Sequence, residues 1–120
     1  MPGIYRVNLD SSITPGDITI ARIYLPPSMR GFDPLRRAFS TWVDHTSFGY
    51  DIVEAIRPEK VVELGTYNGH SYFVFCQSMI ENDIDGLCYA VDTWGGDEHT
   101  GDYGESIFEE VRKHARDHYR

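Results

Sequence analysis

At 120 residues and 13.8 kDa, the chain is long enough for one folded domain and too short for two of ordinary size. Hydrophobic residues make up 41% of the sequence and charged residues 25%, a balance typical of a globular protein and not of a disordered one. The formal net charge of -8 at pH 7 argues against nucleic acid as a partner, because affinity for a phosphate backbone depends on clustered Lys and Arg.

Membrane and secretion signals are not visible in the sequence. No run approaches the roughly 18 apolar residues of a membrane span, and the N-terminus lacks the basic and apolar regions of a signal peptide. Cys76 and Cys88 lie in predicted helix and strand interiors, where thiols usually serve as small buried hydrophobic groups. We therefore expect a soluble protein of a reducing compartment, the cytoplasm, with no membrane partner.

The proline-rich residues 1–34 are interpreted as an N-terminal extension, and residues 35–120 as part of one domain. Within the extension, the β-branched segment ITIARIYL at 18–25 predicts a strand.

Two helices are predicted next. The first covers 35–45, where apolar side chains recur at helical spacing, namely Leu35, Ala38, Phe39 and Trp42. The second covers 51–56 (DIVEAI) and stops before Pro58, because the residue preceding a proline disfavours the α conformation.

A strand, a helix and a second strand follow in the middle of the chain. The apolar runs VVEL at 61–64 and LCYAVD at 87–92 predict strands of the fully buried, parallel kind. Between them, 71–81 predicts a helix with a large apolar set, in which Tyr72, Phe73 and Phe75 are core residues. A loop at 93–105 and an amphipathic helix at 106–116, with Ile107, Phe108 and Val111 inward, complete the order. This order predicts an α/β fold with a Rossmann-like parallel sheet.

The turn between the first strand and the helix contains two glycines. Gly65 permits a tight turn off the strand, and Gly69 permits close approach of a ligand to the helix start. The turn reads GTYNG, with Tyr67 where the dinucleotide fingerprint GxGxxG has its middle glycine. A ligand smaller than a dinucleotide is therefore favoured over NAD.

Each predicted strand ends in a carboxylate. Asp92 follows the second strand, where a carboxylate accepts both hydroxyls of a ribose, and Glu63 ends the first, where it faces an ammonium group. A ligand with a ribose at one end and an amino acid at the other satisfies both side chains.

These segments resemble the class I S-adenosylmethionine-dependent methyltransferases. VVELGTYNGHS resembles the first motif of that family, and YAVDTW resembles its second-strand motif. HTSFGYDIVEAIRPEK and DTWGGDEHTGDYGESIFEEV resemble a bacterial branch that is associated with natural-product and cell-surface sugar genes, some members being fused to glycosyltransferases. The resemblance covers about residues 35–118.

The resemblance implies a set of cofactor-binding residues. Around the methionine part of S-adenosylmethionine it places Glu63, Gly65, Thr66, Tyr67, Gly69 and Ser71. Asp92 binds the ribose, and Thr93 and Trp94 border the adenine. For Ser71 a purely structural role as a helix N-terminal hydroxyl is equally compatible with the sequence.

Because domains of this family are about twice as long, the resemblance implies the N-terminal, cofactor-binding part of a methyltransferase acting on a small-molecule or sugar hydroxyl. A glycosyltransferase-type partner or fused domain, and self-association, are the partners it suggests. The alternative is a non-catalytic Rossmann-like module that acts through self-association or a partner chain.

No catalytic base is identified, since His45, His70 and His99 are each only candidates and His70 is expected to face solvent at the helix start. Trp42 and Phe48 are expected either to pack on the first strand or to cover the site.

The acidic cluster in the loop at 94–105 lacks the spacing of a metal site, so no metal is expected. The glycines of this loop favour a mobile lid over the cofactor: Gly95, Gly96, Gly101 and Gly104.

Overall fold

The computed structural model describes residues 26–119, so the strand predicted at 18–25 lies outside the described part of the chain. Two 3-10 turns precede an alternation of helices and strands. In chain order the elements are η1 (Pro27–Arg30), η2 (Val43–His45), α1 (Thr46–Ile56), β1 (Lys60–Leu64), α2 (His70–Glu81), β2 (Leu87–Val91) and α3 (Glu105–His118).

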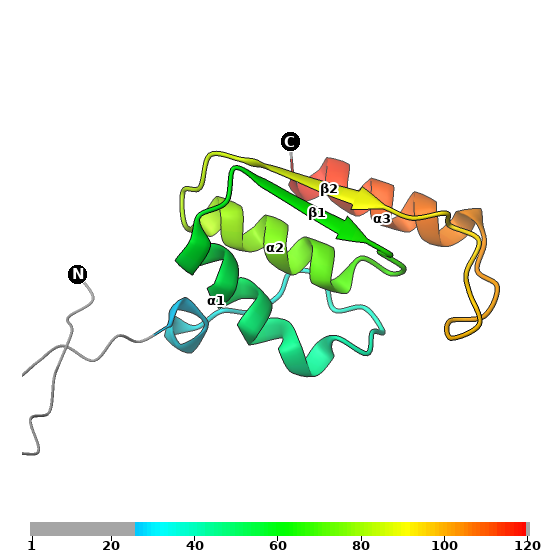
Figure 1. Ribbon diagram of the computed structural model, residues 1–120, viewed down its shortest axis with the longest axis horizontal. Coiled ribbons are helices and arrows are strands. Elements are labelled where there is room, and N and C mark those ends of the chain that lie inside the picture. Colours follow the sequence, from blue (N-terminus) through cyan, green and yellow to red (C-terminus); the bar gives the residue numbers. More distant parts are fainter. Residues whose placement is uncertain (1–25, 120) are drawn as a thin grey trace, which may run out of the picture.

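The two strands form a parallel pair in which Lys60 is opposite Leu87 and Leu64 is opposite Val91. Their carboxyl ends therefore lie side by side, as they do in the strand–helix–strand unit that the sequence predicts (Figure 1). The described residues have a mixed α/β fold with a two-stranded parallel sheet, which is consistent with a partial Rossmann-like fold and confirms the predicted fold class.

The core lies between the sheet and α2 and α3, and α1 packs on the other side of α2 (Figure 1). Phe73 of α2 is only 1% exposed and packs with Val111 of α3, as the apolar spacing of both helices predicts. Gly49 allows α1 to approach α2 closely, because a Cβ there would lie 2.9 Å from the Trp42 ring and 3.1 Å from the Phe75 ring. Trp42 thus packs on Phe75 of α2, with 5.7 Å between the ring centroids.

The prediction of a helix at 35–45 is wrong. Residues 36–40 have no regular secondary structure, residues 43–45 form the 3-10 turn η2, and half-buried and exposed residues alternate along 35–42 instead of following a helical period. Phe39, which was assigned to the apolar helix face, is 80% exposed. Side chains of α2 and the glycine turn bind the backbone of this segment: Gln77 accepts the Leu35 N–H at 2.9 Å, and Asn68 donates to the Phe39 carbonyl at 3.0 Å. These tertiary bonds override the local pattern.

The predicted helix at 51–56 is confirmed, but α1 begins earlier, at Thr46. It ends where Arg57 adopts a left-handed conformation directly before Pro58. The predicted final helix is also confirmed: Val111 is buried, Ile107 packs against the core, and the Phe108 ring lies 5.1 Å from that of Trp94. Among the described helices, none has the length and apolarity to cross a bilayer.

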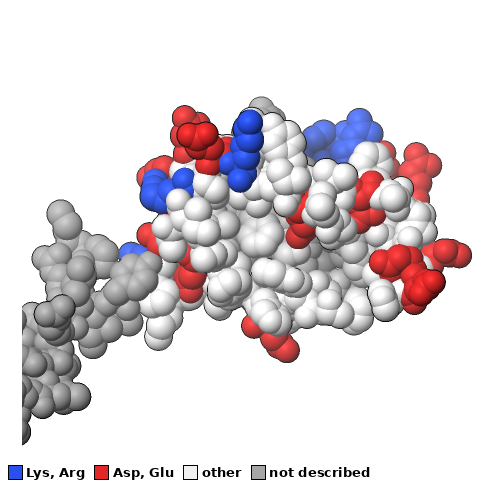
Figure 2. Space-filling view, viewed as in Figure 1, with Lys and Arg blue, Asp and Glu red and all other residues white. Residues whose placement is uncertain are grey.

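The strands are not buried on both sides, which corrects the sequence prediction. Alternate residues of each strand are exposed and form what we call the open face: Val62, Leu64, Leu87, Tyr89 and Val91. Leu64 is 79% exposed. The sequence predicted full burial because both faces carry apolar side chains, whereas in the described residues the helices cover one face alone. In Figure 2 the charged side chains lie around the margin of the visible surface, and acidic ones gather at its right, where the loop after β2 lies.

Candidate functional site

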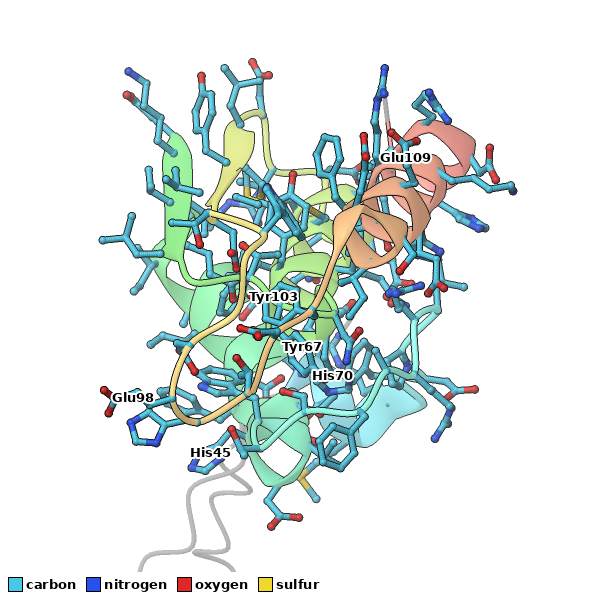
Figure 3. All side chains as sticks on the ribbon, turned by 90° about the vertical axis from the view of Figure 1, so that its right-hand side faces the viewer. His45, Tyr67, His70, Glu98, Tyr103 and Glu109 are labelled. Atoms are coloured by element: carbon cyan, nitrogen blue, oxygen red, sulfur yellow. The ribbon has the colours of Figure 1, made fainter. Side chains whose placement is uncertain are left out.

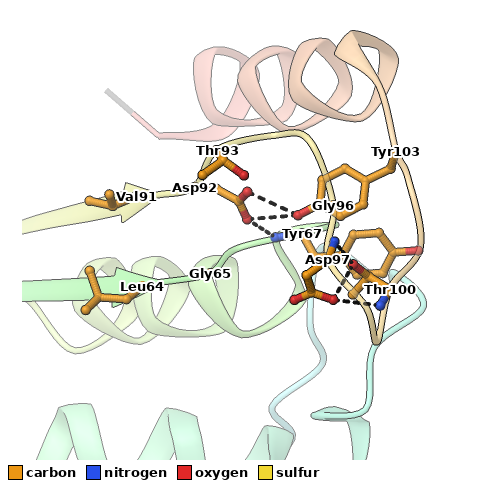
Figure 4. A pocket seen from close by; sticks show the side chains of 10 residues that line it. All are labelled: Leu64, Gly65, Tyr67, Val91, Asp92, Thr93, Gly96, Asp97, Thr100 and Tyr103. Atoms are coloured by element: carbon orange, nitrogen blue, oxygen red, sulfur yellow. Dashed lines mark hydrogen bonds between the residues drawn. The ribbon is translucent and has the colours of Figure 1, made fainter.

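A pocket of about 510 Å³ lies where β1 and β2 end (Figure 4). Both strand ends and the loop between β2 and α3 contribute to its wall, which consists of Leu64, Gly65, Tyr67, Val91, Asp92, Thr93, Gly96, Asp97, Thr100 and Tyr103. Four of the residues predicted to bind a cofactor are therefore in the wall: Gly65, Tyr67, Asp92 and Thr93. The carboxyl ends of parallel strands are the usual ligand site of α/β sheets.

Asp92 connects the two strand ends. Its Oδ2 accepts the backbone N–H groups of Thr66 at 2.7 Å and Tyr67 at 2.9 Å, and its Oδ1 accepts the Trp94 N–H at 2.7 Å. Burial raises the pKa of this carboxyl, but the N–H groups, together with the Tyr103 hydroxyl, outweigh burial and hold the pKa below its usual value. Asp92 is thus a charged group at pH 7 that organises the glycine turn.

Glu63 ends up on the helix-covered face and outside the pocket wall. Its Oε1 accepts the hydroxyl of Ser71, whereas its Oε2 is buried and has no hydrogen-bond partner. Burial raises the pKa of Glu63; the Ser71 and Thr66 hydroxyls lower it in part, and the charge of Asp92 raises it further. A buried carboxylate oxygen without a partner is costly unless a ligand donates to it.

Ser71 and Thr66 complete this polar group. Ser71 does not cap α2, since its hydroxyl donates to Glu63, and α2 has no side-chain cap. Thr66 is 4% exposed and its Oγ1 is a second buried oxygen without a hydrogen-bond partner. The turn after β1 therefore carries two buried oxygens, one from Glu63 and one from Thr66, that make no hydrogen bond of ordinary geometry, although the Thr66 hydroxyl lies near enough to Glu63 to lower its pKa.

The glycine turn has the left-handed backbone that the sequence predicts. Gly65 has φ +83°, and a Cβ there would meet nothing within 4 Å, so its backbone faces open space at the pocket. Gly69 has φ +78°, but a Cβ there would lie 2.8 Å from the Phe73 ring. The small size of Gly69 therefore serves the packing of α2 on its own first turn. Tyr67 also has a positive φ, 47°, which strains a non-glycine residue.

The pairing of Tyr103 with Asp92 is a feature that sequence reasoning missed. Its hydroxyl lies 3.1 Å from each oxygen of Asp92, and its ring lies 4.8 Å from that of Tyr67. Figure 3 shows these two tyrosines next to each other, with Glu98 pointing away at the tip of the loop. Burial and the bond to Asp92 raise the pKa of Tyr103 to about 12. The signal available in the sequence was an aromatic residue next to Gly104, at the end of a polar loop.

Trp94 turns away from the pocket. Its backbone N–H binds Asp92, but its ring packs on Phe108 of α3 and it is absent from the pocket wall. Thr93, its neighbour, does line the pocket. Of the two residues expected to border adenine, the structure thus brings only Thr93 to the pocket.

His70 does not face solvent, which corrects the sequence prediction. It is 4% exposed, and its Nε2 lies 2.7 Å from Thr46 Oγ1. Since the Thr46 hydroxyl donates to the Val43 carbonyl, we infer that Nε2 carries the proton in this bond. Burial, and then the charge of Arg37, lower the pKa of His70, so it is neutral at pH 7. The other two candidate bases, His45 and His99, are exposed.

The loop after β2 is held by its own residues. Asp97 Oδ1 accepts the N–H groups of His99 and Thr100, both at 2.8 Å, and the Thr100 hydroxyl at 2.9 Å. A Cβ at Gly96 would lie 1.9 Å from the Gly101 carbonyl oxygen, so the loop can close on itself only with glycine at 96. Within residues 26–119, no three or more His, Cys, Asp or Glu side chains are placed to hold a metal ion.

One family model matches the second half of the chain. Residues 62–120 match the sequence model of a family described as a methyltransferase domain. The matched range contains most of β1, the glycine turn, β2 and α3, and hence the whole wall of the pocket. The match supports a methyltransferase domain and agrees with the resemblance that the motifs around Glu63 and Asp92 carry.

Three curated proteins are similar to parts of the chain. The uncharacterized protein y4gI of Sinorhizobium fredii is 48% identical over 89 residues, which are 74% of this chain and 9% of that protein. The replicase polyproteins 1a and 1ab of murine coronavirus are each 32% identical over 68 residues, which are 56% of this chain and 2% and 1% of those proteins. The chain thus spans less than a tenth of the length of these relatives. No solved structure matches it.

Proposed function

We propose that this chain is the cofactor-binding part of an S-adenosylmethionine-dependent methyltransferase that acts on a hydroxyl of a small molecule or a sugar. The observation that carries the proposal is the pair of unpartnered buried oxygens, Glu63 Oε2 and Thr66 Oγ1, beside the bare backbone of Gly65. Buried acceptors without donors at the end of a parallel strand fit a ligand that bears an ammonium group.

Each end of the cofactor has residues suited to it. Glu63, Gly65 and Thr66 would hold the amino-acid end, with Ser71 orienting Glu63 through its hydroxyl. Asp92 would accept the ribose hydroxyls, and Thr93 would border the adenine. S-adenosylmethionine supplies a methyl group on a sulfonium, which makes the reaction a displacement in which the protein mainly provides positioning.

Tyr103 occupies the place that the proposal gives to the ribose. Its hydroxyl reaches both oxygens of Asp92, as one hydroxyl of a ribose would. Ribose binding therefore requires Tyr103 to move, and with it the loop between β2 and α3. This agrees with the lid that the loop's glycines predict, and it means that Asp92 is kept hydrogen-bonded when no ligand is present.

The acceptor and the cellular setting follow from the same proposal. A hydroxyl acceptor needs a base. The carboxylates in the pocket wall, Asp92 and Asp97, already accept hydrogen bonds from their neighbours, so in this proposal another part of the protein supplies the base and the acceptor site. A fused or partner domain of the glycosyltransferase type is the candidate. Free thiols at Cys76 and Cys88 fit a cytoplasmic protein.

Calorimetry with S-adenosylhomocysteine and with NAD tests the proposal. We expect S-adenosylhomocysteine to bind and NAD not to bind, and we expect Asp92→Ala to weaken binding by about 1.5–3 kcal/mol, the scale of hydrogen bonds to a charged group. Asp85→Ala, in the turn before β2, is the matched control and should leave binding unchanged. Equal or tighter binding of NAD would show that the pocket is a dinucleotide site.

A second candidate function is association through the open face. Five apolar or aromatic side chains are exposed there side by side, and the described residues leave them uncovered. Such a surface is typical of an interface, and a second copy of this chain would supply the same apolar side chains. Light scattering over a range of concentrations should then show dimers, and Leu64→Lys should abolish them. A monomer at every concentration would exclude this candidate.

A further inference from the structure

Two thiols face each other across the interface between α2 and β2, away from the pocket at the strand ends. Cys76 of α2 is 6% exposed and belongs to the core, and Cys88 of β2 packs against the same cluster. Both are free thiols, and each shifts the pKa of the other. Neither takes part in the proposed cofactor site.

A small cavity gives access to this pair. It has a volume of about 210 Å³, and both cysteines line it together with Tyr72 and Tyr119. The Tyr72 hydroxyl donates to the backbone carbonyl of Cys88 at 3.2 Å, which fixes the strand residue against the helix. The Tyr119 hydroxyl is buried without a partner, so the cavity offers a donor to a small polar molecule. Water and hydrogen peroxide are of a size that such a cavity admits.

We propose that Cys76 and Cys88 are a peroxide-responsive dithiol that closes to a disulfide between α2 and β2. In the first step the Cys88 sulfur attacks one oxygen of hydrogen peroxide, the O–O bond breaks, and hydroxide leaves and takes up the thiol proton as water. Cys88 is thereby oxidised to a sulfenic acid and the peroxide is reduced. In the second step the Cys76 sulfur attacks the Cys88 sulfur, the S–O bond breaks, and a second water leaves with the proton of Cys76.

The environment assigns the two roles. The hydrogen bond from Cys76 lowers the pKa of Cys88 against the opposing effect of burial, which favours the thiolate that attacks peroxide. The hydrogen bond to Cys88, and then burial, raise the pKa of Cys76, which therefore stays a thiol until the sulfenic acid has formed beside it. Cys88, the less buried of the two thiols, is thus the attacking residue, and Cys76, which is 6% exposed, is the resolving one.

Closure would link the two elements that carry the proposed cofactor site. α2 starts at the glycine turn and β2 ends next to Asp92, so a bond between Cys76 and Cys88 fixes the start of one relative to the end of the other. A disulfide removes conformational freedom from the unfolded chain, so the oxidised chain should unfold at a higher temperature than the reduced one, by a modest amount because the closed loop is short.

Peroxide oxidation of the full chain, followed by alkylation of remaining thiols with iodoacetamide, tests the proposal. We expect a monomer that has lost two hydrogen atoms, carries no alkyl group, and yields a Cys76–Cys88 peptide that dithiothreitol separates. In Cys76→Ser we expect a sulfenic acid that persists at Cys88 and is trapped by a 1,3-diketone reagent. In Cys88→Ser we expect Cys76 to remain a thiol and to be alkylated.

Three results would overturn the proposal. Wild-type protein in which both thiols are still alkylated after peroxide would show that the pair does not close. A disulfide between two chains would show that the cysteines react from the outside. Oxidation of Cys76 in Cys88→Ser at the wild-type rate would reverse the assigned roles. The peptide map of the wild-type chain decides the first two results even where a serine variant fails to fold.

Discussion

The two faces of the β1–β2 sheet have similar strand sequences and opposite environments. The covered face, which consists of Val61, Glu63, Cys88 and Ala90, lies against the helices. Its carboxylate accepts the Ser71 hydroxyl of α2, and its thiol packs on the core cluster that contains Cys76. The open face has five apolar or aromatic side chains that the described residues leave exposed. The difference shows that hydrophobicity along a strand does not identify which face the helices cover. The buried polar side chain of Glu63 lies on the covered face.

The largest expected effect on the free energy of unfolding is in the core under the covered face, and a substitution on the open face provides the contrast. Phe73→Ala removes a 1% exposed ring that packs against α3, and we expect it to lower the free energy of unfolding by about 3–5 kcal/mol. Leu64→Ala on the open face should change it by less than about 0.5 kcal/mol, because the side chain is mostly in water. Urea unfolding monitored by circular dichroism measures both. A large loss for Leu64→Ala would mean that the open face is covered in solution.

Asp92→Ala tests the carboxylate that connects the ends of β1 and β2. The N–H groups of Thr66, Tyr67 and Trp94 lose their acceptor, so we expect a loss of about 1.5–3 kcal/mol in unfolding free energy at pH 7. Because the pKa of Asp92 is lowered by folding, its contribution is complete above the usual carboxyl pKa and disappears as the pH falls through the lowered value. Unfolding curves of both proteins should therefore converge in acid. A difference that persists in strong acid would contradict this explanation.

Tyr103→Phe should have a smaller effect, and with opposite signs on stability and binding. Loss of the hydroxyl that binds Asp92 should lower the unfolding free energy by about 0.5–1.5 kcal/mol. Because the ribose then no longer competes with the Tyr103 hydroxyl for Asp92, S-adenosylhomocysteine should bind more tightly by a similar amount. Tyr89→Phe on the open face is the matched control, for which neither quantity should change. Weaker binding by Tyr103→Phe would show that Tyr103 helps to hold the ligand instead of standing in for it.

Glu63→Gln should give the smallest change and tests the polar group of the covered face. Folding raises the pKa of Glu63, so the ionised side chain weakens the fold once the pH rises from the usual carboxyl value of 4.5 through the raised one. We therefore expect Glu63→Gln to be slightly more stable than wild type at neutral pH and equal to it in acid, while it binds S-adenosylhomocysteine more weakly. Thermal unfolding at two pH values measures the first effect. A less stable variant at neutral pH would show that Glu63 is fully compensated.

Local sequence patterns predicted the strand–turn–helix–strand unit well because its signals are local. Gly65 and Gly69 have the positive φ angles that the turn requires, and the apolar spacing of 71–81 placed Phe73 in the core. Carboxylates at the two strand ends predicted a polar site there, and the structure brings the turn after Glu63 within hydrogen-bond distance of Asp92. For these features the neighbours in sequence are also the neighbours in space.

Tertiary contacts decided the features that the sequence alone did not. Residues 35–42 have a helical spacing of apolar side chains, but Gln77 and Asn68 bind their backbone and they form no helix. His70 follows a glycine in a polar turn, but Thr46 of α1 covers it. Tyr103 reaches Asp92 because a loop folds back, and the open face differs from the covered one because both helices that follow a strand pack on the same side. Each of these outcomes depends on residues distant in sequence, whose hydrogen bonds and packing outweigh the weak preferences of a local pattern.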